Sequence, residues 1–300
     1  MEGYSHPVRR LTITLEVFAY ALPVLLLAYF VVIGGDFFSA IGQVIPSVIV
    51  GSVVTFSGAT YLRWRRLRGP FDTLLKSDAD HMDLFTVKRA LLMHPRYEAL
   101  SMAVRYPVGV GIAGAIIALV GEMSMTRFVV IIVGMCMVVP VNAAFFFFQS
   151  EISLSRYLKD RRLAAIIIEK DKYRPFRLFP KILFVLLSLL LPPLTILVTF
   201  VTLISLGMLR LEYLIIHFIF VSSIMIATSV SAAFFFAKSL KGTISDMERS
   251  LDDIARGELG SDFVPMITLD EAGSMSVYVN NLMMKIKEVV SMIQSMSAEL

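Results

Sequence analysis

The sequence predicts an all-α, polytopic membrane protein in which six transmembrane helices form three hairpins and a cytoplasmic four-helix coiled coil follows in a dimer. Three observations predict this fold class. Hydrophobic residues make up 57% of the 300 residues and charged residues only 17%, with a mean hydropathy of +0.75, so the chain has more apolar surface than a soluble fold of this size can bury. The apolar residues gather in long runs separated by polar links. Two stretches of heptad-spaced apolar residues follow the last run.

Six apolar segments are long enough to cross a bilayer, whose hydrocarbon core of roughly 30 Å needs about 20 helical residues. Arg9 and Arg10 precede the first segment as they would in a signal peptide. No clear small-residue cleavage site follows them, so we expect a retained first helix. The six predicted spans are 17–34, 41–62, 106–121, 128–149, 182–206 and 211–237.

Lysine and arginine are distributed unevenly between the links, which predicts the orientation of the spans. The short links 35–40, 122–127 and 207–210 contain zero, one and one such residues, whereas 63–105 and 151–181 contain nine each. We therefore expect the long links and both termini to be cytoplasmic, with membrane lipids as partners through their phosphates. This distribution also accounts for the net charge of +4, and it contains no nucleic-acid footprint.

The spans also suggest an internal repeat. "AAFFFFQS" at 143–150 reappears as "AAFFFAKS" at 232–239, an offset of 89, and a second pair of similar segments begins at His6 and His94, an offset of 88. Because the offsets agree, we expect residues 1–237 to contain a triplicated helical hairpin of about 88 residues. An aromatic belt at the cytoplasmic interface would explain the first pair on its own.

Apolar residues recur at alternating spacings of four and three on either side of a polar connector that is rich in glycine and aspartate. Two amphipathic helices of this length bury their stripes poorly within one chain, whereas two chains bury them in a parallel four-helix bundle. We therefore expect a homodimer in which Asn280 faces away from the seam. The predicted seam consists of Ile244, Met247, Leu251 and Ile254 in the first helix and of Met275, Val279, Leu282 and Ile286 in the second, where the stripe continues to Leu300.

The ends of the connector carry local helix signals. Gly257 is suited to end the first helix, because glycine readily adopts the left-handed conformation of many helix ends. Asp270 and Glu271 are suited to start the second helix, because carboxylates accept hydrogen bonds from its free N–H groups and favour the positive end of its dipole.

The order of helix, "GEL", connector, "DEAG" and helix is similar to the HAMP domain of bacterial receptors, a relay between membrane helices and cytoplasmic output modules. The resemblance covers a domain predicted at 238–288, although Thr243 stands where many of these domains have a proline. It implies a signal-relay role for Gly257 and Leu259 at the end of the first helix, for Val264 or Ile267 as the second connector hydrophobe, and for Asp270, Glu271 and Gly273 at the start of the second helix.

Six spans followed by such a relay resemble a subset of bacterial sensors, including class III adenylate cyclases and spirochaete-type chemoreceptors. The resemblance implies a signal-transduction receptor of the bacterial inner membrane that senses a membrane-borne or intramembrane stimulus, since the outer links are too short for a sensor domain. The sequence does not identify the ligand. Because the heptads run to Leu300, we expect 289–300 to begin an output coiled coil leading to a downstream domain of the same chain. By analogy, a chemoreceptor signalling helix is slightly favoured over an adenylate cyclase.

The chain carries no recognisable catalytic motif, so we expect no enzyme within these residues. It lacks a phosphate-binding loop, an H-E-x-x-H zinc pair, a nucleophile elbow and a kinase signature. We also expect no cofactor and no metal site, since Cys136 is the single cysteine and the acidic stretch 77–83 lacks the glycine and glutamate of a calcium loop. A cyclase domain would lie beyond Leu300.

A few residues within the predicted spans are candidates for ligand binding or helix packing. His217 suits either a ligand or pH-sensing role or an interfacial position, and Asn142 favours an interhelical hydrogen bond over a ligand contact. Pro192 and Pro193 predict a kink in the fifth span. The alternative function is a six-helix transporter or channel with a dimerising cytoplasmic coiled coil. Ion-coupled transport predicts a charge near a span's midpoint, whereas Glu212 and the other charges lie at span ends.

Overall fold

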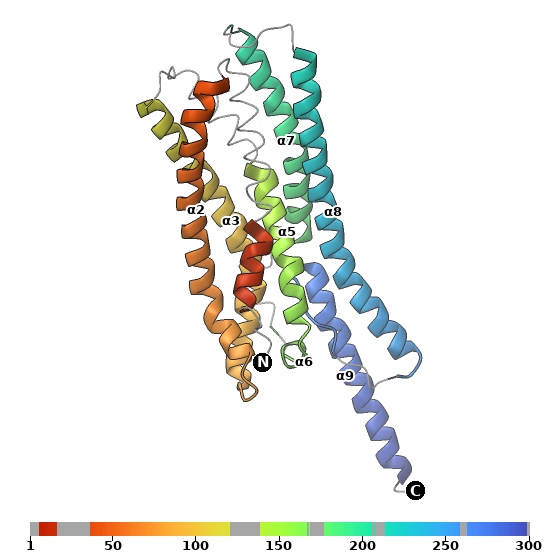
Figure 1. The fold of residues 1–300 in the computed structure, drawn as a ribbon. Helices are drawn as coiled ribbons and strands as arrows, with labels where there is room; N and C mark the ends of the chain where they lie inside the picture. The colour runs from red at the N-terminus through yellow and green to blue at the C-terminus, as the bar shows by residue number, and fades with distance from the viewer. Residues whose placement is uncertain are drawn as a thin grey trace. The chain divides into compact units, whose positions relative to one another are not determined.

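The structure, a computed structural model, describes residues 6–16, 37–120, 139–166, 168, 177–205, 207, 214–258 and 263–298. These residues form helices joined by turns and contain no strand, which confirms the all-α class for this part of the chain. Residues 7–16 are helical. The remaining helices (Figure 1) are α2 (Phe37–Leu74), α3 (His81–Val120), α5 (Val139–Leu158), α6 (Arg161–Ala164), α7 (Leu178–Ser205), α8 (Leu214–Ala255) and α9 (Glu271–Ala298).

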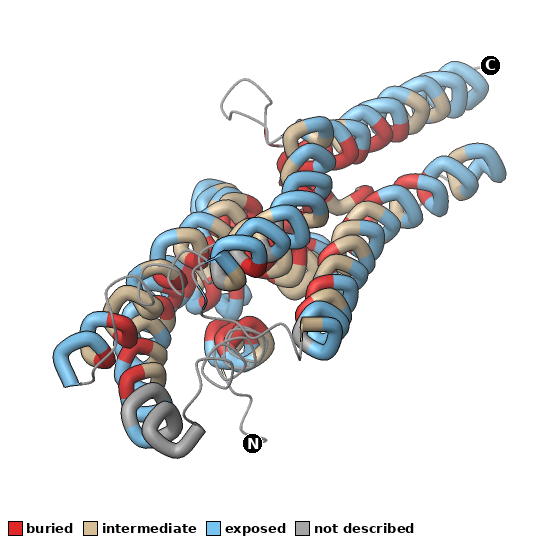
Figure 2. Tube along the Cα trace, turned by 90° about the horizontal axis from the view of Figure 1, so that it is seen from above, coloured by how far each residue is buried: buried red, intermediate tan, exposed pale blue. Residues whose placement is uncertain are grey.

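Four of these helices are long and apolar enough to cross a membrane: Ile45–Leu74, His81–Val120, Leu178–Thr202 and Leu214–Ala255. No more than 22% of the apolar window of any of them is buried within the chain, so most of their side chains face outward. Figure 2 shows this as exposed residues along the helices, with the buried residues on their other sides. The chain is therefore a helical protein suited to a membrane.

Four predicted spans, 41–62, 106–121, 182–206 and 211–237, fall mainly on these helices. The predicted first span, 17–34, lies outside the described residues, and so does the first half of the predicted fourth span, 128–149.

Helix α8 runs without a break for 42 residues, from the sixth predicted span into the heptad-spaced stretch. It ends where the sequence predicts. Gly257 has a φ of +76°. Its N–H donates to the Ile254 carbonyl at 3.0 Å, and the N–H of Glu258 donates to the Asp253 carbonyl at 2.9 Å. This pair of bonds is a Schellman helix end, which places a residue in the left-handed region and therefore favours glycine.

The chain divides into two compact units. The first, here called the membrane unit, comprises 1–69, 95–150 and 183–235. The second comprises 70–94, 151–182 and 236–300, and is here called the relay unit after the role that the resemblance implies for 238–288. Helices α2, α3, α5, α7 and α8 each contribute residues to both units.

Within the membrane unit, α2 and α3 approach each other closely at two glycines. A Cβ atom on Gly51 would lie 2.5 Å from the carbonyl oxygen of Gly109, which is a steric clash. A Cβ atom on Gly109 would lie 3.2 Å from Cγ2 of Thr55. Small residues permit such crossings, in which dispersion contacts between backbones hold apolar helices together.

Within the relay unit, two basic side chains hold α6 in place through backbone carbonyls. The buried Lys88 of α3 donates from Nζ to the carbonyls of Leu163 and Ile166, at 2.8 and 2.7 Å. Arg162 donates to the carbonyls of Leu74 and Lys76 at the end of α2, both at 2.7 Å. These bonds satisfy carbonyls that a helix end leaves without an intrahelical partner.

Candidate functional site

The connector between α8 and α9 is packed against both helices. Val264 is 3% exposed and forms an apolar cluster with Met247 of α8 and Val279 of α9, against which Ile254 also packs. Ile267 is buried as well. The predicted connector residues Val264 and Ile267 thus lie inside the relay unit, whereas Leu259 is outside the described residues.

The side chain of Asn280 in α9 forms two hydrogen bonds with the connector backbone at Val264. Its Oδ1 accepts a hydrogen bond from the Val264 N–H at 2.7 Å, and its Nδ2 donates to the Val264 carbonyl at 2.9 Å. The prediction that Asn280 faces outward is wrong, because its side chain is only 4% exposed. The heptad pattern identifies only apolar residues. It therefore cannot predict the burial of an amide side chain that hydrogen-bonds to the connector backbone.

Asp270 caps α9 at its first turn. Its Oδ1 accepts hydrogen bonds from the Gly273 N–H at 3.1 Å and from the Thr268 hydroxyl at 2.6 Å, which is the geometry of an N-cap residue. A Cβ atom on Gly273 would lie 1.9 Å from the Thr268 carbonyl oxygen, so only glycine fits there without movement of the backbone. The predicted "DEAG" residues therefore form a tight, ordered helix start.

The other carboxylate oxygen of Asp270 belongs to a buried ion-pair cluster. Nζ of Lys181, in the first turn of α7, lies 2.7 Å from Oδ2 of Asp270 and 2.7 Å from Oε1 of Glu151 in α5. The hydroxyl of Ser239 in α8 donates to the second oxygen of Glu151. We call these four residues, Glu151, Lys181, Ser239 and Asp270, the Lys181 cluster; all four are buried.

The charges of the cluster are unequal, with two carboxylates around one ammonium. Burial raises the pKa of Glu151 above its ordinary value, although Lys181 and the Ser239 hydroxyl oppose that effect. Burial would also raise the pKa of Asp270, but the charge of Lys181 and three hydrogen bonds outweigh it and hold that pKa below its ordinary value. The pKa values of the two carboxylates are thus shifted in opposite directions, although each lies 2.7 Å from Nζ of Lys181.

Glu271, the next residue along the chain, also contacts α7. Its side chain is exposed, and Oε2 accepts a hydrogen bond from the backbone N–H of Leu178. Asp270 and Glu271 thus both meet the first turn of α7, a contact that sequence reasoning missed. No local signal in the sequence points to it, because Lys181 and Asp270 are 89 positions apart.

The residues of the predicted seam divide into two sets. Met247 and Val279 are buried within the chain, while Ile254 and Ile286 are half-buried. The other four residues are between 44% and 54% exposed: Ile244, Leu251, Met275 and Leu282. Within each helix the exposed pair is separated by one heptad, so each helix presents an apolar row that the chain itself does not cover.

The candidate residues within the predicted spans show few described contacts. Asn142 is 6% exposed, and among the described residues its Nδ2 has no hydrogen-bond partner. Pro193 is exposed and lies within α7, which continues past both prolines to Ser205. The side chains of His217 and Pro192 are outside the described set.

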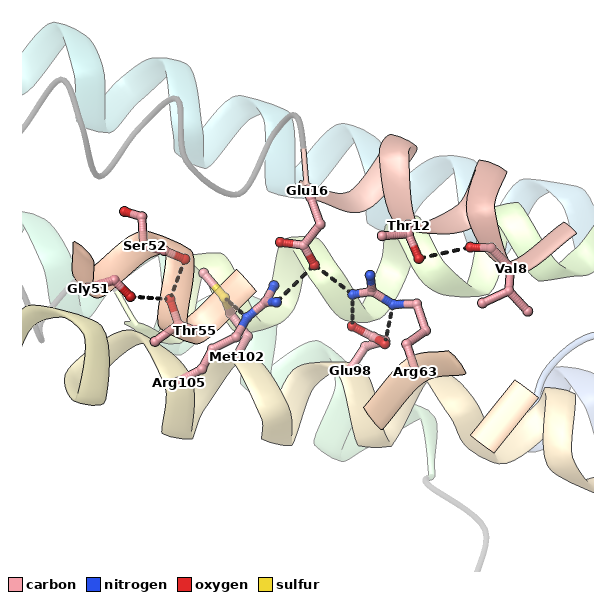
Figure 3. A network of polar contacts seen from close by, with 10 residues as sticks. All are labelled: Val8, Thr12, Glu16, Gly51, Ser52, Thr55, Arg63, Glu98, Met102 and Arg105. Atoms are coloured by element: carbon pink, nitrogen blue, oxygen red, sulfur yellow. Dashed lines mark hydrogen bonds and ion pairs between the residues drawn. The ribbon is translucent and has the colours of Figure 1, made fainter. Parts of the chain in front are cut away.

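The membrane unit holds a second buried network, drawn in Figure 3, that sequence reasoning missed. Arg63 of α2 binds Glu98 of α3 through two bonds of 2.8 and 2.7 Å and reaches Oε1 of Glu16 at 2.8 Å. Arg105 of α3 donates to the same oxygen of Glu16 at 2.8 Å. Glu16, Arg63 and Arg105 adjoin the ends of predicted spans, where charged residues are ordinary. The seven-residue spacing of Glu98 and Arg105 was the available signal that they share one face of a helix.

Comparisons of the chain with protein-family models, with curated proteins and with solved structures found no match. Among the described residues, no group of three or more histidine, cysteine, aspartate or glutamate side chains is placed to hold a metal ion. What the described residues offer chemically is therefore ion pairing, helix capping and an uncovered apolar face.

Proposed function

We propose that the chain is a transmembrane signal-transduction receptor module of the bacterial inner membrane, with both termini in the cytoplasm. In this proposal it senses a membrane-borne or intramembrane stimulus and passes it through a dimeric HAMP-like relay to an output domain further along the chain. The observation that carries the proposal is the continuity of α8 from a candidate membrane span into the heptad-spaced stretch. A continuous helix transmits rotation, tilt or translation because its backbone hydrogen bonds leave no flexible joint.

The exposed rows on α8 and α9 support the dimer. Each row repeats every seven residues and is flanked by residues of the same stripe that are buried inside the chain. A second copy placed in parallel would cover both rows, as a and d residues are covered in a coiled coil. Uncovered, such rows would expose large apolar side chains to water.

The interior of the relay unit supports a bundle with more than one packing. The hydroxyls of Thr243 and Ser250 on α8 and of Ser276 on α9 are buried, and within the described part of the chain none of them has a hydrogen-bond partner. Buried hydroxyls without partners weaken the packing they occupy, since each costs about 1–3 kcal/mol relative to a satisfied group. A second packing of α8 and α9 would therefore compete with a weakened first packing, which is what a two-state relay requires.

The identity of the output rests on resemblance to known receptors. We propose a chemoreceptor signalling helix in preference to an adenylate cyclase, because the last turns of the second helix are rich in serine, glutamine and methionine. In either case the relay would deliver one of two α9 positions to the next domain.

Disulfide crosslinking in native membranes tests the proposal. Single cysteines replace Met275, Leu282 or the matched control Asn281, which is exposed on another side of the same turn of α9, in a Cys136→Ala background. We expect strong crosslinking between chains at Met275 and Leu282 and little at Asn281. Equal crosslinking at all three positions, or none, would remove the dimeric relay.

A six-helix transporter or channel is the second candidate, and the Glu16–Arg63–Glu98–Arg105 network favours it. Buried charges in membrane helices often mark ion or substrate pathways. Here two arginines and two glutamates balance one another, which is also the arrangement of a structural network. Ion or solute flux in proteoliposomes that stops in an Arg63→Met variant would establish the transporter and displace the receptor.

A further inference from the structure

The first turn of α7 is joined to the start of α9 by two independent contacts. Lys181 pairs with the capping residue Asp270, and the Leu178 N–H donates to Glu271. One contact is a buried ion pair and the other is a backbone hydrogen bond to an exposed carboxylate. The start of the second relay helix is therefore fixed to α7 as well as to the connector.

The same lysine also connects α9 to the first relay helix. Lys181 binds Glu151 of α5, and Glu151 accepts a hydrogen bond from Ser239 of α8. A continuous series of polar contacts thus runs from α8 through Glu151 and Lys181 to Asp270. All four residues belong to the relay unit.

We propose that α7 is a second input to the relay, and that Lys181 is the positioning residue through which α7 sets the position of α9. This inference rests on the proposed relay function and adds to it, since a relay driven by α8 alone has no need of the α7 contacts. In this arrangement a displacement of α7 moves α9 directly through Lys181, while α8 acts on α9 through the connector and, less directly, through Ser239 and Glu151.

The geometry around Asp270 makes the coupling stiff. Oδ1 is held by Thr268 and Gly273, and Gly273 is fitted so closely against Thr268 that a single methyl group would clash. If Lys181 moves and keeps its bond to Asp270, the first turn of α9 must therefore move with it. Breaking the Lys181–Asp270 pair instead leaves the buried carboxylate of Asp270 without its cationic partner, which is strongly unfavourable. The two positions of α9 would accordingly be discrete.

The test measures the rotational position of each relay helix in membranes containing the full chain, again in a Cys136→Ala background. For α9 the readout is the ratio of crosslinking at a cysteine replacing Leu282 to that at one replacing Asn281. For α8 it is the corresponding ratio for Ile244 and the exposed Arg249. Lys181→Met removes the ion pairs. Leu178→Pro removes the backbone N–H together with the half-buried leucine side chain, at a first helical position where proline is tolerated.

We expect Lys181→Met to change the α9 ratio by about fivefold or more, the lower end of coupling between linked sites. The α8 ratio should change by less, because Lys181 reaches α8 only indirectly, through Glu151 and Ser239. Leu178→Pro should change the α9 ratio in the same direction and by less. If Lys181→Met does not accumulate, the neutral triple variant Glu151→Gln, Lys181→Met, Asp270→Asn takes its place, because it leaves no unpaired charge and keeps a capping residue.

Each other outcome is decisive. An unchanged α9 ratio, with normal crosslinking of the parent chain, would overturn the α7 input and leave the relay standing. Equal changes in α8 and α9 would assign Lys181 a purely structural role and overturn the inference as well. Absence of crosslinking in the parent chain would remove the proposed relay itself.

Discussion

At the scale of single residues, Gly273 occupies the tightest position among the described glycines. Gly273→Ala should destabilise this unit by roughly 1–3 kcal/mol, because the new methyl group must displace the Thr268 carbonyl or the first turn of α9. The measurement is thermal unfolding in detergent. The matched control is Gly242→Ala in α8, where a Cβ atom meets nothing within 4 Å and the helix should gain stability. Equal behaviour of the two variants would contradict the close fit.

The two acids of the Lys181 cluster differ in their pH dependence. The pKa of Glu151 is raised above 4.5 by burial, so its contribution to stability is complete below that pH and is lost as the pH rises through its folded-state pKa. The pKa of Asp270 is lowered below 3.8 despite burial, chiefly by Lys181. Its contribution is present above 3.8 and is lost as the pH falls through its folded-state pKa.

The Glu151→Gln variant should therefore become more stable relative to the parent chain as the pH is raised from 4.5 through the folded-state pKa of Glu151. The reason is that the amide stays neutral where the buried carboxyl must ionise. The measurement is a series of unfolding midpoints in detergent against pH. Asp270→Asn is the control of opposite sign, since its deficit should shrink as the pH falls below 3.8. Parallel curves for all three proteins would refute the assignment.

At the scale of elements, the end of α8 depends on one backbone conformation. Gly257→Leu should cost about 1–2 kcal/mol, because a φ of +76° brings Cβ close to the following carbonyl. The connector would then start in a different direction, so the α9 crosslinking ratio of Leu282 to Asn281 should change. Gly257→Asn is the control and should have a smaller effect, since asparagine tolerates this region. A normal ratio in Gly257→Leu would show that the helix end is not part of the relay.

The elements that the sequence predicted are those with local signals. The end of α8 at Gly257 and the start of α9 at Asp270 follow from residues that satisfy backbone groups within one turn. The prediction that Asn280 faces outward was wrong for a related reason. Spacing alone identifies the apolar side of a helix, but α9 also buries Ser276, Asn280 and Met283, a side set by the connector and by α8.

At the scale of the whole molecule, charge partners were beyond prediction. Lys181 and Asp270, like Glu16 and Arg105, are 89 positions apart, and each looked like an ordinary charge beside a span or at a helix start. Hydropathy records how much of a helix is apolar and contains no information on which helices become neighbours. The class of the protein was therefore readable from the sequence, while the contacts that join its helices required the packed structure.

The buried network around Glu16 also constrains the order in which the protein is assembled during synthesis. Glu16 pairs with Arg63 and Arg105, which follow it by 47 and 89 positions. As the ribosome adds the chain from its N-terminus, the carboxylate of Glu16 emerges long before either arginine exists. The first helical segment must keep this charge in water until α3 has been made. Packing of that segment against α2 and α3 through Glu16 is thus a step that follows the synthesis of α3.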